Sequence, residues 1–221
     1  MLKISIRRFI IHCQRLFIVI VTILCLINTV YAKTVTSENN RVSKTEFVSK
    51  DNRFKIIKEC YAKDEWNSYC DYYRQTGAKR PQTIASGVKE FEDTVSWLQN
   101  TARIYLGGCG NPCKMDVFVD ATHKPEFIEN LIAVDHNNLC AAYPDSKGII
   151  FKKLFSNKID HIFAYKDYPS LESAANFAAV EGAVNYDGDM VLSYYSTDSG
   201  DGEDNEGEVT IAVKNPCGKK D

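Results

Sequence analysis

Cysteine is the residue type that most constrains how this chain of 221 residues can fold. Two of its eight cysteines lie in an N-terminal segment that we expect to be removed, which leaves an even set of six: Cys60, Cys70, Cys109, Cys113, Cys140 and Cys217. An even set in an exported chain is typical of a disulfide framework, for which fifteen connectivities are open. Their short spacings favour pairing Cys60 with Cys70 and Cys109 with Cys113. Subtraction then leaves Cys140 with Cys217, a bridge that would tie the C-terminus to the core.

The first 32 residues have the pattern of a signal peptide. A basic stretch, 1–15, precedes an almost wholly apolar run at Leu16–Ile27, and Val30-Tyr31-Ala32 predicts cleavage after Ala32. An uncleaved anchor is the alternative, because Leu16–Ala32 reaches the lower limit for spanning a bilayer. In either case the remainder would be exported, to the periplasm or the exterior, and would meet a membrane only if the segment stays uncleaved.

The charge balance argues against general binding to nucleic acid. Residues 33–221 carry 23 basic and 29 acidic side chains, a net charge of about −6. A protein that binds the phosphate backbone without sequence preference needs the opposite sign. We therefore expect a small-molecule ligand or a protein partner, and no nucleic acid.

Four segments are expected along the chain: a signal peptide at 1–32, a flexible leader at 33–53, a cysteine-stapled helical cap at 54–85 and an α+β domain at 86–221. The leader is polar and has no sustained period. At the start of the last segment, apolar residues recur at helical spacing over Ser86–Leu106, which predicts a long amphipathic helix.

Further along, the apolar period shortens to two residues, as in strands. Met115–Val119 predicts a strand covered on both faces, and Leu131–Tyr143 predicts a hairpin whose turn is Asp135-His-Asn-Asn138. Ser170–Val180 is expected to be helical. Two closing strands are expected at Val191–Tyr195 and Val209–Val213, separated by an acidic loop.

This order of elements resembles the extracytoplasmic PAS-like (Cache) sensor domains over roughly residues 86–215. The residues that carry the resemblance are the Ile-Ala-Val-Asp hairpin ending in Ala-Ala-Tyr-Pro-Asp, and Gly182 with Tyr186 before the closing strands. It implies an α+β fold, an antiparallel PAS-like sheet packed on a long N-terminal helix, here with disulfides. It also implies a small-metabolite pocket beside the sheet.

Two sets of residues are candidates for binding. Aromatic side chains with a polar tip suit the lining of a pocket for a small polar ligand, although such residues are often plain core. The candidate lining residues are Tyr143, Phe163, Tyr186 and Tyr194. In the acidic loop, hard oxygen ligands on a glycine-rich backbone suit Ca²⁺, but the spacing does not match an EF-hand, and a solvated hairpin loop is the alternative. The candidate metal ligands are Asp198, Asp201, Glu203 and Asp204.

Three histidines each stand near an aspartate: His123 near Asp120, His136 next to Asp135, and His161 next to Asp160. Neutral imidazole with carboxylate is a ligand set for zinc and an arrangement for a general base, but the spacing matches no standard motif. We assign no catalytic residue and no cofactor beyond Ca²⁺. The sequence therefore predicts an exported ligand-binding or sensor-like domain without catalytic activity. A secreted hydrolase with a His/Asp site and a secreted host-interaction factor are the alternatives.

Overall fold

The computed structural model describes residues 43–63, 66–90, 95–108, 114–176, 179–198 and 205–218. The chain divides into two compact units, Met1–Arg41 and Val42–Asp221, and the described residues all belong to the second. The predicted signal peptide and the first part of the predicted leader lie outside the described residues.

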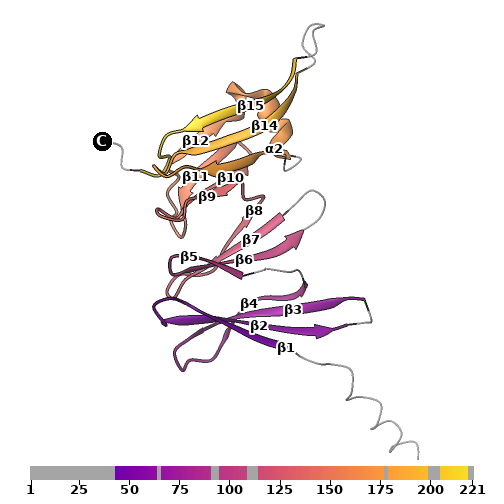
Figure 1. Cartoon of the computed structure of the whole chain (residues 1–221), viewed down its shortest axis with the longest axis vertical. Coiled ribbons are helices and arrows are strands. Elements are labelled where there is room, and N and C mark those ends of the chain that lie inside the picture. The colour runs from indigo at the N-terminus through magenta and orange to yellow at the C-terminus, as the bar shows by residue number, and fades with distance from the viewer. Residues whose placement is uncertain are drawn as a thin grey trace, which may run out of the picture. The chain divides into compact units, whose positions relative to one another are not determined.

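The described chain is almost entirely antiparallel β-sheet, in which successive strands pair with one another (Figure 1). Sheet A contains β1 (Ser43–Val48), β2 (Phe54–Ala62), β3 (Ser68–Thr76) and β4 (Gln82–Lys89). Sheet B contains β5 (Val95–Leu98), β6 (Thr101–Gly108), β7 (Lys114–Val119) and β8 (Glu126–Glu129).

The second half of the chain continues this meander. Sheet C contains β9 (Ala133–Val134), β10 (Cys140–Asp145), β11 (Gly148–Lys153) and β12 (His161–Ala164). After a 3₁₀ turn, η1 (Tyr165–Asp167), and the helix α2 (Pro169–Asn176), sheet D contains β13 (Glu181–Val184), β14 (Met190–Asp198) and β15 (Asn205–Val213). Sheets A, B and C thus have four strands each among the described residues, whereas sheet D has three.

Alternation of side chains along the strands creates three apolar layers. Sheets A and B share a core that includes Ile56, Tyr72, Ile104 and Val117. On the other face of sheet B, Phe118 and Ile128 pack with Val134 and Ala141 of sheet C. Because neighbouring residues of one strand enter different layers, as Val117 and Phe118 do, sheet B is buried on both faces.

The third and largest core lies between sheets C and D. Ile149 and Phe151 of β11 meet Met190 and Leu192 of β14, and the apolar side of α2 joins them through Leu171.

One close approach joins the first strands of sheets C and D. A Cβ atom at Gly182 would lie 2.7 Å from Ile132 Cγ2 and 2.9 Å from Ala133 Cβ, so only glycine fits where β13 crosses the start of β9.

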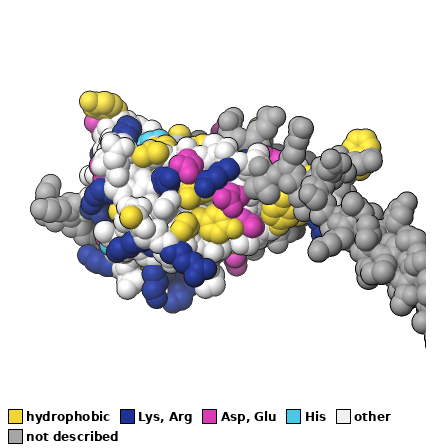
Figure 2. Space-filling view, turned by 90° about the horizontal axis from the view of Figure 1, so that it is seen from below, with side chains coloured by type: hydrophobic (Ala, Val, Ile, Leu, Met, Phe, Trp, Pro, Cys, Tyr) yellow, Lys and Arg dark blue, Asp and Glu magenta, His cyan; other side chains and the backbone are white. Residues whose placement is uncertain are grey.

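The outer face of sheet A is polar. Lys55 Nζ lies 2.6 Å from a carboxylate oxygen of Glu46, and Lys44 lies 3.6 Å from Glu46 and 3.7 Å from Glu59. Seen from the β1–β4 end of the molecule, Lys and Arg side chains intermingle with Asp and Glu and with smaller hydrophobic areas (Figure 2).

The expected α+β class, with its long N-terminal helix, is wrong. Residues of the expected helix Ser86–Leu106 instead belong to β4, β5 and β6, and β5 and β6 are joined by the turn Gln99-Asn100. Gly87 and Gln99 have φ of +66° and +54°, values that a right-handed helix excludes. The apolar residues that recur at helical spacing are instead buried on the two opposite faces of sheet B. Val95 packs in the core between sheets A and B, whereas Leu98 packs in the core between sheets B and C.

The predicted helical cap at 54–85 is a β-hairpin instead. Cys60 and Cys70 stand directly opposite each other in β2 and β3, and their disulfide is formed as predicted. The end of the predicted leader is also ordered, because β1 pairs along its whole length with β2.

Downstream of residue 114 the predicted elements are present. Strand β7 is buried on both faces, and the hairpin at Leu131–Tyr143 forms from β9 and β10. Its turn is held by Asp135, whose carboxylate accepts hydrogen bonds from the Asn137 backbone (2.8 Å) and the Asn138 side chain (2.8 Å). The short helix α2 and the closing strands β14 and β15 also agree with the prediction.

Candidate functional site

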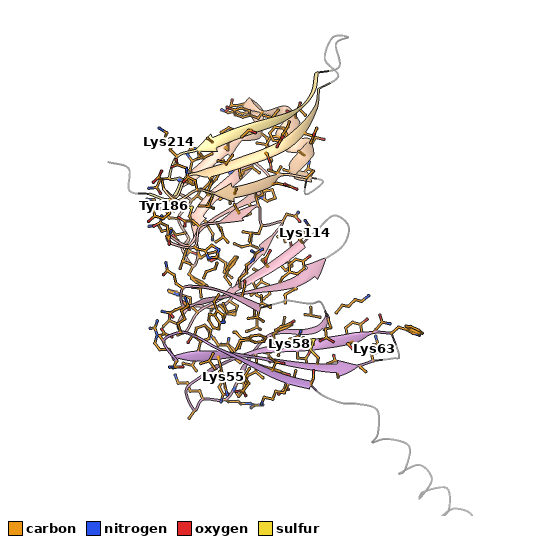
Figure 3. All side chains as sticks on the ribbon, viewed as in Figure 1. Lys55, Lys58, Lys63, Lys114, Tyr186 and Lys214 are labelled. Atoms are coloured by element: carbon orange, nitrogen blue, oxygen red, sulfur yellow. A yellow bond between two sulfur atoms is a disulfide. The ribbon has the colours of Figure 1, made fainter. Side chains whose placement is uncertain are left out.

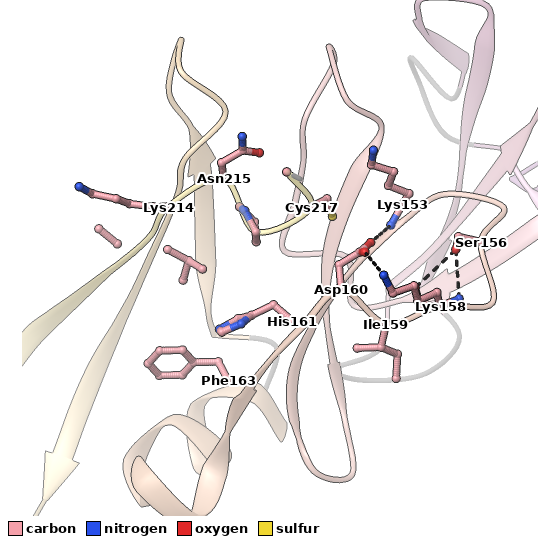
Figure 4. A pocket seen from close by; sticks show the side chains of 14 residues that line it. Lys153, Ser156, Lys158, Ile159, Asp160, His161, Phe163, Lys214, Asn215 and Cys217 are labelled. Carbon is pink, nitrogen blue, oxygen red and sulfur yellow. Dashed lines mark hydrogen bonds and ion pairs between the residues drawn. The ribbon is translucent and has the colours of Figure 1, made fainter. Parts of the chain in front are cut away.

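An open cleft of about 1220 Å³ lies between sheet C and the C-terminal segment (Figure 4). One side comes from the β11–β12 loop and β12, including Lys158, His161 and Phe163. The other side comes from the last residues of β15 and the segment after it, including Lys214 and Pro216.

A disulfide holds the C-terminal wall of the cleft in place. Cys217 is bonded to Cys140 of β10, as predicted, at a separation of 77 along the chain. The Asn215 backbone N–H also donates to a carboxylate oxygen of Asp189 in the β13–β14 turn, at 2.9 Å. The segment after β15 is therefore attached both to sheet C and to sheet D.

Local hydrogen bonds shape the opposite wall. The Asp160 carboxylate accepts from the Lys153 backbone N–H at 3.3 Å, and the Asp160 N–H donates to the Phe151 carbonyl at 3.0 Å. The Ser156 hydroxyl accepts from the Lys158 backbone N–H at 3.0 Å. These bonds fold the loop back on β11 and direct its lysines to the rim of the cleft.

The cleft is basic. Lys153, Lys158 and Lys214 line it, and His161 adds a group that can be protonated. The one carboxylate among the lining residues, Asp160, lies 4.0 Å from Lys158 Nζ and is thus partly neutralised. In a chain whose body carries a net charge of about −6, this local excess of positive charge favours an anionic ligand.

Apolar groups stand beside these lysines. The Phe163 ring packs on Tyr168 with centroids 4.3 Å apart, and the His161 ring lies 5.7 Å from that of Phe151. Both His161 and Phe163 project from β12 toward the C-terminal segment (Figure 4). Ile159, at the entrance, is 44% exposed. The cleft can therefore contact the apolar part of a ligand as well as its negative charge.

Of the four aromatic residues predicted to line a pocket, the structure places only Phe163 in this cleft. Tyr194 is buried in the core between sheets C and D, and its hydroxyl lies 3.3 Å from that of Ser170 in α2. Tyr143 packs, half buried, against the core between sheets B and C, and burial raises its pKa above the ordinary value. Tyr186 is 97% exposed in the β13–β14 turn, on the same side of the molecule as Lys214 in Figure 3.

The predicted Ca²⁺ ligands fall mostly outside the described residues. Asp198 is the last residue of β14, opposite Asn205 of β15. The other three, Asp201, Glu203 and Asp204, lie in the undescribed loop, and the Cys109–Cys113 disulfide prediction also falls on residues outside the described ones.

The three histidines occupy separate places. His123 Nδ1 lies 2.6 Å from the Asp120 carboxylate, and its ring stacks on Phe155 with centroids 5.0 Å apart. His136 is exposed in the β9–β10 turn, and His161 is exposed on β12. In the described part of the chain, no group of three side chains close enough to hold a metal ion contains a histidine.

The His123–Asp120 pair borders a smaller cavity of about 480 Å³. Arg74 of sheet A fixes its loop by donating to the backbone carbonyls of Asp120 (2.8 Å) and His123 (2.5 Å). Burial raises the pKa of Asp120, but hydrogen bonds from His123 and Thr122 outweigh it and hold that pKa below the ordinary value. The carboxylate thus serves to order the loop.

Sequence reasoning missed the lysines of the cleft. Lys153 ends β11 of sheet C, Lys214 follows β15 of sheet D, and the two are far apart in the chain, so no local motif connects them. The predicted Cys140–Cys217 bridge could have indicated that Lys214 lies near sheet C, because the bridge brings the residues next to Cys217 onto that sheet.

No protein-family model matches this sequence, and neither a curated protein nor a solved structure matches the chain. The resemblance to Cache domains therefore stays a prediction. The two disulfides are compatible with an oxidising compartment. The described residues contain no helix with the length and apolarity that crossing a bilayer requires.

Proposed function

We propose that this is an exported, non-catalytic binding protein, periplasmic or secreted, that holds an anionic ligand in the cleft between sheet C and the C-terminal segment. The observation that carries this proposal is the gathering of Lys153, Lys158 and Lys214 around one cavity whose single carboxylate, Asp160, is itself close to a lysine. Clefts lined by one sign of charge raise the local concentration of ligands of the opposite sign.

The surroundings of these three lysines are typical of a binding site and not of an ordinary solvated surface. They stand beside apolar groups on both walls, Phe163 on β12 and Pro216 in the C-terminal segment, and ligand sites typically combine such apolar walls with a few charged groups. The C-terminal wall is tethered by the Cys140–Cys217 disulfide, so little of its conformational freedom would be lost on binding.

Charge reversal tests the proposal. The oxidised protein and a K153E/K158E/K214E variant would be titrated with citrate, succinate, glutamate and inorganic phosphate while thermal unfolding is followed. A ligand present at 100 times its dissociation constant stabilises the folded state by about 2.7 kcal/mol. We expect at least one anion to raise Tm in the unmodified protein and to have no effect on the variant.

A matched control separates the cleft from net charge. K50E/K79E/K89E changes the net charge equally at three exposed lysines of the first 90 residues, and we expect it to bind as the unmodified protein does. Equal loss of the anion effect in both variants, or an effect that survives K153E/K158E/K214E, would show that the cleft is not the binding site.

A further inference from the structure

Sheet D is one strand short of the pattern set by the other three sheets. Among the described residues, sheets A, B and C each contain four successive antiparallel strands, whereas sheet D contains three and ends at β15. In the described chain, β15 pairs only with β14, over all nine residues from Asn205 to Val213. The other edge of a long strand presents backbone N–H and C=O groups that an added strand can pair with.

The described residues after β15 do not form that fourth strand. After Val213 the chain turns at Asn215, whose φ is +31°, and reaches Cys217, which is bonded to Cys140. Residues 214–218 are therefore held against sheet C and do not fold back along β15.

The cleft meets the C-terminal end of β15. On one side of the C–D pair the first strands, β9 and β13, are in close contact at Gly182. On the other side, β12 is the edge of sheet C and β15 is the edge of sheet D, and both line the cleft, β12 with His161 and Phe163 and β15 with its last two residues, Ala212 and Val213. An extended segment that enters the cleft would thus meet the end of β15 on one side and the rings of β12 on the other, and it could continue along the edge of β15 beyond the cleft.

Charge orients such a segment. Lys214 follows β15 directly, and Lys153 and Lys158 lie across the cleft from it. Toward the opposite end of β15, Glu208 is exposed. Acidic side chains of a bound strand would therefore lie beside Lys214 and not beside Glu208, while its apolar side chains would contact Phe163.

We propose that the ligand of the cleft is an extended acidic peptide segment of another protein, which adds to β15 as the fourth strand of sheet D. This inference rests on the proposed function, because it names the class of anion that the cleft takes. Addition of a strand to a sheet edge draws affinity from main-chain hydrogen bonds and specificity from side-chain contacts.

The test uses a labelled peptide, Asp-Glu-Val-Thr-Val-Thr-Val, and two derivatives that are N-methylated at alternate residues in opposite phase. In a strand, successive N–H groups point to opposite edges, so only one phase would remove the hydrogen bonds to β15. By fluorescence anisotropy we expect one methylated peptide to bind about tenfold or more weakly than the parent, and the other to bind about as well. Equal binding by both derivatives would overturn the inference.

Exchanging the charges of the protein and the peptide provides a gain of binding, which a misfolded variant could not show. Lys214→Glu should weaken the acidic peptide, and a peptide with Lys-Lys in place of Asp-Glu should bind this variant better than it binds the unmodified protein. Failure of the swapped peptide to gain affinity would contradict the orientation and hence the inference.

The remaining outcomes distinguish the two proposals. If citrate binds in the cleft but the peptide neither binds nor displaces it, the proposed function stands and the peptide inference fails. If neither binds, both fail. If the protein sediments as a dimer that the peptide does not dissociate, or if a synthetic peptide of residues 33–42 occupies β15 more tightly than the acidic peptide, the edge belongs to a copy of the chain or to its own segment, and the inference is overturned.

Discussion

The first and last sheets of this chain end in different ways. Sheet A has four strands, and its outer face carries an ion-paired network around Glu46, Lys44 and Lys55. The hydrogen bond from Lys55 holds the pKa of Glu46 below its ordinary value, against an opposing effect of burial and with help from the charge of Lys55. Sheet D has three described strands, and its edge strand β15 borders a basic cleft. The comparison agrees with the proposal that the ligand binds beside sheet D, whereas the outer face of sheet A is a solvated, ion-paired surface.

The two disulfides of the described residues also differ between the first sheet and the cleft. Cys60–Cys70 staples neighbouring strands within sheet A and closes a loop of 10 residues. Cys140–Cys217 closes 77 residues and attaches the wall of the cleft to sheet C. Only the second therefore combines a large entropic effect with a role in the candidate site.

Removal of the disulfides gives the largest expected effects. On the chain-entropy model, C140S/C217S should lower the free energy of unfolding by about 4.5 kcal/mol and C60S/C70S by about 2.7 kcal/mol. Urea unfolding of both double variants measures the difference. C140S/C217S should also abolish binding of anions in the cleft, whereas C60S/C70S should leave it unchanged under conditions where both variants are folded.

The opposite results would contradict the assignment of binding to the cleft and not to sheet A. A C60S/C70S variant that loses anion binding while remaining folded would mean that the site depends on sheet A. Retention of binding by C140S/C217S would mean that the C-terminal segment does not form a wall of the site.

A smaller effect on stability is expected at alkaline pH, from Tyr165 in the core between sheets C and D. Burial, followed by the charges of Glu172 and Asp145, raises the pKa of Tyr165 from 10.0 to about 12. In the folded state Tyr165 therefore stays protonated to a higher pH than it does in the unfolded chain. Its contribution to the free energy of unfolding is fully present below pH 10 and is lost as the pH rises from 10 to about 12. The loss should be on the order of 2 kcal/mol.

Tyr165→Phe isolates this contribution. The variant should lose less stability between pH 10 and 12 than the unmodified protein, as measured by urea unfolding at each pH. Absorbance titration of the phenolate gives a direct check, and an ordinary pKa for Tyr165 would contradict the expectation.

The smallest effect is expected on the outer face of sheet A. Lys55→Ala removes the 2.6 Å contact with Glu46, but both side chains are exposed to solvent, where ion pairs contribute little. We expect no resolvable change in the urea midpoint and no change in anion binding. A clear loss of stability would show that this face is more than a solvated end.

Local patterns in the sequence were sufficient for part of the fold. The Asp135–Asn138 turn was predictable because a short polar side chain bonds the backbone of its own turn, and because two short apolar runs flank it. The Cys60–Cys70 bridge was predictable because ten residues suffice for a hairpin that places the two side chains opposite each other.

The helix prediction failed because periodicity does not identify which surface covers a residue. In Ser86–Leu106, apolar residues at helical spacing serve two different cores on opposite faces of sheet B. The same region carries positive φ at Gly87 and Gln99, which only the tertiary structure reveals. The prediction of aromatic pocket residues succeeded for Phe163, which lines the cleft, and failed for Tyr194, which is buried in the core.

By itself, the sequence determined the features that depend on neighbours in the chain: the Asp135 turn, the closing strands β14 and β15, and the short-range pairing of Cys60 with Cys70. The tertiary structure alone decided which sheets stack, which strand edge stays free and where the lysines converge. The physical reason is that Lys153, Lys158 and Lys214 act together only through a cavity made by packing two sheets and one long-range disulfide. Such a cavity has no period and no spacing along the chain.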